Sequence, residues 1–207
     1  MENTQHSENL SDAKPAALIV LQVGDPFTRN ELAAMRLRGS VREVLPGAYV
    51  PAGQPDAPWI RAHVAAAVAG EQYVPGRALC KGTAAWIYGC APMPTKLDIV
   101  LPRYHRPCNP RAGMVLRLSE GVIDDEQICT VGGIAVTAPL RTAMDIAFNL
   151  EIIDSMPVLA AINATGRLRC NYAQMFESIT GQVRRPGRRR ALMALSRLME
   201  TQLPAAA

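Results

Sequence analysis

Apolar residues recur along this chain with two periodicities, and each periodicity predicts a different kind of secondary-structure element. A spacing of three and four places apolar side chains on one face of a helix, whereas strict alternation is typical of a half-buried strand. The helical spacing, together with cap and stop residues, predicts helices over residues 15–23, 28–38, 59–69, 81–88, 137–150, 156–165, 171–179 and 187–203. The alternating pattern predicts strands over residues 96–102 and 114–118, and hairpins over 41–50 and 128–136 that turn at Pro46-Gly47 and Gly132-Gly133.

The first helix–hairpin pair carries the strongest local signals. Thr28 and Glu31 form the T-x-x-E capping box that begins a helix. The spacing then predicts that Leu32, Met35 and Leu37 face inward. Four polar side chains are left for the outer surface: Arg29, Asn30, Arg36 and Arg38. A short helix with a basic outer face, followed at once by a hairpin, is the sequence form of a small winged-helix unit and indicates nucleic acid.

The order of elements predicts an α+β protein. Residues 53–58 (GQPDAP) have the composition of a linker. We therefore expect a disordered tail over residues 1–14, a winged-helix domain over 15–52, and a mixed α/β domain over 59–207 that ends in basic helices. Strands in the middle of this second segment, with helices before and after them, suggest the mixed α/β fold.

Composition and charge refine this expectation. Apolar residues make up 49% of the chain, which is enough for a sizeable core. The net charge is +4, yet residues 167–207 alone hold eight arginines against two glutamates. A local basic excess of this kind attracts polyanions. The longest apolar run, residues 16–23, is too short to span a bilayer.

The five cysteines predict neither disulfides nor a metal site. Their number is odd and no two stand in C-x-x-C spacing, the pattern in which zinc ligands usually cluster. We expect reduced thiols in a soluble cytoplasmic protein without a cofactor.

Four segments resemble a known family. They are FTRNELAAMRLRGSVREVLPGAYVP (27–51), CKGTAAWIYG (80–89), KLDIVLPRYHRP (96–107) and GGIAVTAPLRTAMDIA (132–147). Together they resemble the AbiEi-type antitoxins of type IV abortive-infection toxin–antitoxin systems. The last segment is the most specific, because it follows the form G-x-x-V-T-x-P-x-R-T-x-x-D-x-A.

This resemblance implies a phage-defence antitoxin with a winged helix that binds double-stranded DNA at operator repeats and represses its own operon. It also implies a second domain that counters a nucleotidyltransferase-like toxin, with or without direct contact. Two departures stand out. Little room lies between Met35 and Val41 for a separate recognition helix, and the chain ends without the nuclease-like extension of some relatives.

Candidate DNA contacts fall in two regions. On the first helix, which Thr28 begins, Arg29, Asn30 and Arg36 could reach base edges, while Arg38 and Arg42 hold phosphates. A solvated helix face is the alternative. The second region is the run RRPGRRR, whose arginines contact a polyanion or lie in solvent: Arg184, Arg185, Arg188, Arg189 and Arg190. DNA, RNA and an acidic protein partner all remain open for this run.

Two further groups carry weaker signals. Arg103, Tyr104, His105 and Arg106 follow a strand on a loop, where they bind a phosphate or a base or are simply exposed. Arg141 and Asp145 stand one helical turn apart and can pair, with Thr137 as the N-cap and Pro139 in the first turn. We interpret that motif as a signature of the fold.

No catalytic motif is present in the sequence. Asp98 has the strand context of a nucleotidyltransferase carboxylate, but its partner carboxylate and the Gly-Ser turn are missing. The sequence therefore predicts a non-enzymatic, DNA-binding regulator. Two alternatives stay open: a protein-interaction module that binds a toxin directly with little DNA binding, and a stand-alone regulator without a toxin.

Overall fold

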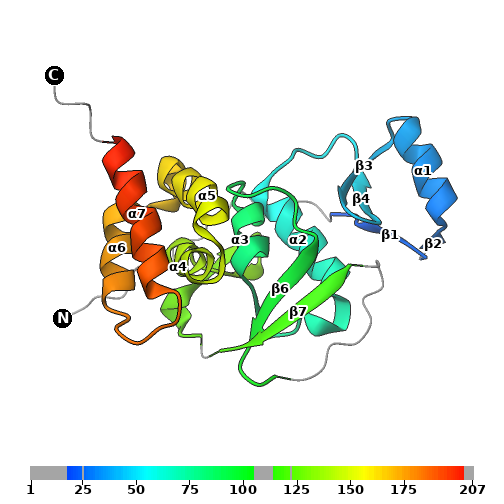
Figure 1. Ribbon diagram of the computed structural model, residues 1–207. Helices are drawn as coiled ribbons and strands as arrows, with labels where there is room; N and C mark the ends of the chain where they lie inside the picture. The colour runs from blue at the N-terminus through cyan, green and yellow to red at the C-terminus, as the bar shows by residue number, and fades with distance from the viewer. Residues whose placement is uncertain (1–17, 25, 105–113, 122, 203–207) are drawn as a thin grey trace, which may run out of the picture.

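The computed structural model describes residues 18–24, 26–104, 114–121 and 123–202, and shows an α+β protein with two sheets (Figure 1). The first sheet holds four strands in the order β2-β1-β4-β3 and the second holds five in the order β7-β6-β5-β9-β8. Seven α-helices surround them within the described residues. The mixed α+β class predicted from the sequence is correct.

The first sheet is built around the predicted hairpin. Strands β3 (Val41–Leu45) and β4 (Ala48–Pro51) pair antiparallel across Pro46 and Gly47, and α1 (Arg29–Leu37) packs beside β3. A shorter pair, β1 (Leu21–Val23) and β2 (Pro26–Phe27), completes the sheet.

Strand β1 corrects the helix predicted over residues 15–23. Leu21 lies opposite Tyr49 and Gln22 opposite Ala48, so β1 is an added strand on the free edge of β4. An unbroken apolar run does not distinguish helix from strand by periodicity, and here the hydrogen bonds that β4 offers decide. Residues 15–17 of the predicted helix lie outside the described part of the chain.

The second sheet is mixed. The central strand β5 (Ala78–Leu79) pairs antiparallel with β6 (Lys96–Leu101) and parallel with β9 (Ile134–Thr137). Strand β7 (Val115–Glu120) lies parallel to β6, and β8 (Ile128–Val131) forms the predicted hairpin with β9. Helices α2 (Pro58–Ala69) and α3 (Lys81–Ile87) and three 3-10 turns at Gly70–Gln72, Asp125–Gln127 and Gly166–Leu168 accompany these strands.

Four helices follow the second sheet: α4 (Pro139–Asn149), α5 (Ile152–Ala164), α6 (Tyr172–Thr180) and α7 (Arg188–Gln202). Pro139 stands in the first turn of α4 as predicted, but the N-cap is Ala138 and not Thr137. The Thr137 hydroxyl is instead buried in a 2.8 Å hydrogen bond with the hydroxyl of Thr142. Helix α5 begins four residues earlier than predicted and contains Pro157 in its interior.

One hydrophobic core joins the two sheets. Val44 and Val50 of the first hairpin belong to the same buried cluster as Ile60 of α2 and Leu79 of β5. The linker therefore connects two parts that are packed together rather than freely hinged. In Figure 1, α1 lies at one end of the molecule and α6 and α7 lie at the opposite end. Within the described residues, no helix is both long and apolar enough to cross a membrane.

The buried cysteines lead to the first testable prediction. Cys80 and Cys170 are buried and free, and burial raises the pKa of Cys170 to about 12. Since the thiolate is the reactive species, neither thiol should react with a maleimide near neutral pH while the chain is folded, and both should react once denaturant is added. Peptide mass mapping after labelling measures this. Rapid modification of either residue in the native protein would contradict the described packing.

Candidate nucleic-acid interface

Helix α1 begins with the capping box that the sequence predicted. The Thr28 side chain accepts a hydrogen bond from the Glu31 backbone N–H at 3.3 Å, and the Glu31 carboxylate accepts one from the Thr28 N–H at 2.7 Å. These hydrogen bonds from the Thr28 backbone and hydroxyl hold the pKa of Glu31 below its usual range. Two of the backbone donors at the start of α1 are thereby satisfied, so a nine-residue helix can hold its first turn in place.

The inner face of α1 rests on the hairpin. Leu32 is fully buried and clusters with Val41 and Tyr49, and Met35 packs against this cluster. Leu37, which the spacing assigned to the inner face, is 85% exposed, so that assignment is wrong. The reason is geometric, because Leu37 lies in the last turn of the helix, beyond the small cluster that the first sheet provides.

The outer face of α1 gathers four of the predicted contact residues. Arg29, Asn30 and Arg36 lie along the helix, and Arg38 forms its C-cap; all four are exposed. Helix α1 ends at Leu37 and β3 begins at Val41, and the two elements are in contact. The helix and the hairpin predicted from the sequence are therefore both present and adjacent, and the winged-helix role stays a prediction.

Arg42 occupies a different environment from these four. Its Nε donates to the Gln54 carbonyl at 3.4 Å and its Nη2 donates to the Pro55 carbonyl at 2.8 Å. The guanidinium therefore anchors the linker to β3. Thr28 is likewise engaged, because its hydroxyl serves the capping box.

The C-terminal arginines divide into two groups. Arg184 and Arg189 are exposed. Arg185 donates to Asp145 at 3.2 Å and stacks on the Phe148 ring, while Arg188 and Arg190 donate to the carbonyls of Thr180 and Phe148 at 3.0 Å each. These three arginines are therefore neither fully solvated nor free, because each has a partner within the protein. Their predicted contact with a polyanion stays a prediction.

The loop after β6 is described only in part. Arg103 and Tyr104 are exposed, and the Tyr104 backbone N–H donates to the Glu120 carboxylate at 3.2 Å. His105 and Arg106 lie outside the described residues. This group therefore stays a prediction.

Two buried carboxylates have arginine partners from other segments of the chain. Asp98 is 2% exposed and pairs with Arg117 of the neighbouring strand. Asp145 pairs with Arg141, as predicted, but also with Arg185 from the loop that precedes α7. The i,i+4 spacing signalled only the first of these partners. In the part of the chain that the structure describes, no three His, Cys, Asp or Glu side chains gather in a way that could hold a metal ion.

Comparison with known protein families gives a match over the second part of the chain. Residues 77–201 match the AbiEi antitoxin C-terminal domain. The crystal structure of RV2827C protein from Mycobacterium tuberculosis is similar at 17% sequence identity, covering 88% of this chain and 72% of that chain with a TM-score of 0.42. No curated protein matches the sequence. Since the family model covers more than half of the chain, including the second sheet from β5 onward and all four C-terminal helices, the protein belongs to the AbiEi antitoxin family and has the antitoxin domain of a toxin–antitoxin system.

Proposed function

We propose that this antitoxin binds double-stranded DNA through the exposed face of α1 and the adjoining hairpin, in the manner of a short winged helix, and represses its own operon. The observation that supports this most directly is the exposed set Arg29, Asn30, Arg36 and Arg38 on a capped helix that leads straight into a hairpin. The protein would also counter a nucleotidyltransferase-like toxin through its family domain.

The chemistry of α1 suits a helix that contacts a duplex. Guanidinium groups bind phosphates and guanine edges, and an asparagine can pair with adenine in the major groove. With Arg42 bound to the linker carbonyls, the phosphate contacts of this region fall mainly to Arg38 and to the arginines of α1. Arg184 precedes α7 and Arg189 lies on it, and α7 is at the opposite end of the molecule from α1 in Figure 1. These two arginines would therefore add contacts only to a long duplex or through a second subunit.

The test is a double substitution on α1. Arg29→Gln with Arg36→Gln should weaken binding to DNA from upstream of the protein's own gene by about 10–100-fold and lower the salt slope by about 2, because each phosphate contact contributes about 1 to that slope. Fluorescence anisotropy across a salt series measures both quantities. The matched control is Arg197→Gln with Arg189→Gln, two exposed arginines on α7.

Equal binding by the α1 variant and the wild type would contradict the proposal. If the control pair lost affinity instead, the C-terminal arginines would be the DNA contact. Charged exposed positions on α1 tolerate glutamine, so folding should be unchanged by circular dichroism.

A protein-interaction role is the second candidate, and the exposure of Leu37 favours it. An isolated leucine that is 85% exposed beside a basic face fits a partner's apolar pocket better than it fits a phosphate backbone. Leu37→Ser should then abolish co-purification with the product of the neighbouring gene, while DNA affinity stays the same. The DNA proposal predicts no dependence of co-purification on Leu37.

A further inference from the structure

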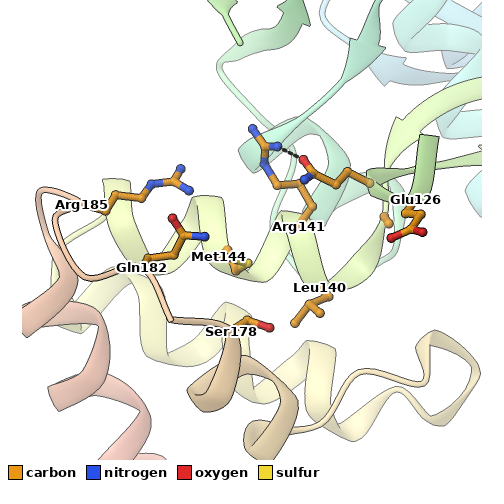
Figure 2. Close-up of a pocket in the computed structure, with 9 residues that line it drawn as sticks. Glu126, Leu140, Arg141, Met144, Ser178, Gln182 and Arg185 are labelled. Atoms are coloured by element: carbon orange, nitrogen blue, oxygen red, sulfur yellow. Dashed lines mark hydrogen bonds between the residues drawn. The ribbon is translucent and has the colours of Figure 1, made fainter. Parts of the chain in front are cut away.

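A pocket of about 350 Å³ opens between α4, α6 and the loop that joins α6 to α7 (Figure 2). Its polar lining comes from segments far apart in the sequence. The residues are Glu126 and Gln127 from the 3-10 turn before β8, Arg141 from α4, Ser178 from α6, and Gln182 and Arg185 from the loop. This volume is in the range of small-molecule sites. The pocket lies within the family domain, yet the proposed DNA contacts on α1 do not involve it.

The two arginines of the pocket share one buried carboxylate. Arg141 Nε lies 3.2 Å from both carboxylate oxygens of Asp145, and Arg185 Nη2 lies 3.2 Å from Oδ1 of the same group. The Asp145 side chain is 4% exposed, whereas those of Arg141 and Arg185 are 18% and 32% exposed. Asp145 balances one guanidinium, and the other charged group that lines the pocket is the exposed carboxylate of Glu126.

Further contacts within the protein fix the orientation of both guanidinium groups. Arg185 stacks on the Phe148 ring with 4.2 Å between its Cζ and the ring centre, and Arg141 also donates to the Gln127 side chain. A guanidinium has five N–H donors in a fixed fork, and Asp145 engages one nitrogen of each. Donors fixed in this way match the oxygens of a carboxylate or phosphate group.

The other lining residues indicate what the remainder of the ligand should be like. Leu140, Met144 and Ala138 provide an apolar surface, and the Gln182 amide and Ser178 hydroxyl supply neutral hydrogen-bonding groups. Glu126 is exposed and lies on the side of the pocket away from Arg185 in Figure 2. Water screens its charge more than that of the half-buried arginines.

We propose that this pocket binds a small organic anion, in which one carboxylate or phosphate group pairs with Arg141 and Arg185 and a compact apolar body packs on Leu140 and Met144. The second arginine is the main argument. A structural ion pair needs only Arg141, whereas Arg185 stands 40 positions after Asp145 in the sequence and adds a second guanidinium to the cavity.

To test this, the full-length protein is titrated with phenyl phosphate, with benzoate and with the neutral analogue benzyl alcohol. Calorimetry or NMR measures the binding of each compound. At least one anion should bind saturably, with an affinity about tenfold or more above that of benzyl alcohol. The reason is that only the anions can form charge-assisted hydrogen bonds with the two arginines. The tighter of the two anions identifies the group as phosphate or carboxylate.

Two variants and a control locate the binding. Arg185→Gln should weaken binding of the anion by about tenfold or more. Gln182→Trp should fill the pocket with a large side chain. Gln182 is an exposed loop residue with no hydrogen bond to Asp145, so this variant leaves the ion pairs of Asp145 in place. Arg189→Gln, exposed on α7, is the control and should leave affinity within about twofold, because surface charges at a distance are screened.

The proposal fails if the wild type binds neither anion saturably, or if both pocket variants bind as the wild type does. It also fails if Arg189→Gln lowers affinity as much as Arg185→Gln, because the site would then be the general basic surface. Since α1 is unchanged in Arg185→Gln and Gln182→Trp, both variants should keep the DNA affinity that α1 supplies, and this keeps failure here separate from failure of the DNA proposal.

Discussion

Replacing Asp145 with alanine is expected to lower the free energy of unfolding by about 3–5 kcal/mol, the usual cost of removing one partner from a buried ion pair. Asp145 lies on α4 with a side chain that is 4% exposed, and it receives hydrogen bonds from both Arg141 and Arg185. Alanine leaves both guanidinium groups without their shared counter-charge. Urea unfolding followed by circular dichroism measures the change.

Two further variants sharpen this prediction. Asp145→Asn keeps the shape and some hydrogen bonding but removes the charge, so its loss should be smaller than that of Asp145→Ala. Glu177→Ala removes an exposed carboxylate from the neighbouring helix α6 and should change stability by no more than about 0.5 kcal/mol. A loss below about 1 kcal/mol for Asp145→Ala would show that the shared carboxylate does not hold α4 to the α6–α7 loop.

The second large effect is expected from Gly187→Ala, which should destabilise the protein by about 2–4 kcal/mol through backbone strain and overlap. Gly187 immediately precedes α7 with φ +82°, a conformation that favours glycine. A Cβ there would lie 2.6 Å from the Phe148 carbonyl oxygen, and this backbone atom cannot move aside as a flexible side chain would. Thermal or urea unfolding gives the magnitude.

Gly181→Ala is the matched control, because it changes a glycine on the same loop. Gly181 has φ −62°, and the nearest atom to a Cβ there is the Ser178 carbonyl oxygen at 3.6 Å. Alanine fits this position and should be neutral or stabilising by about 0.4–1 kcal/mol. Equal stability of the Gly187→Ala and Gly181→Ala variants would contradict the close approach of the loop to α4.

Both substitutions test the same structural feature, which is the attachment of the α6–α7 loop to α4. Asp145 attaches the loop through Arg185, and Gly187 lets the backbone approach Phe148 closely enough for α7 to begin. This attachment also forms one wall of the pocket. Loss of the attachment is therefore expected to affect anion binding along with stability.

Much of the local structure was predictable because its causes lie within a few residues. The Thr28–Glu31 capping box, the Pro46-Gly47 and Gly132-Gly133 turns and Pro139 in the first turn of α4 each act over three or four positions. The exposed basic face of α1 was predictable for the same reason, because helical periodicity determines which side chains point away from the buried face of a helix.

Two of the errors have the opposite property, because their causes lie in the tertiary structure. Residues 21–23 are a strand because β4, more than twenty positions later, offers them an open edge. Leu37 is exposed because the cluster under α1 does not extend to its last turn. The third error is local, because the Thr137 hydroxyl bonds that of Thr142, five positions later, instead of capping α4.

The sequence by itself determined the α+β class, most of the elements, the capped basic helix and the resemblance to the AbiEi antitoxins, because these depend on short-range spacing and on motifs. Only the tertiary structure decided which charges pair. In the folded protein Arg42 donates to the linker and Arg185 donates to Asp145. Arg185, from the basic run over residues 184–190, therefore lines a pocket. A guanidinium bonds whichever oxygens the fold brings within about 3 Å, and no local pattern encodes that distance.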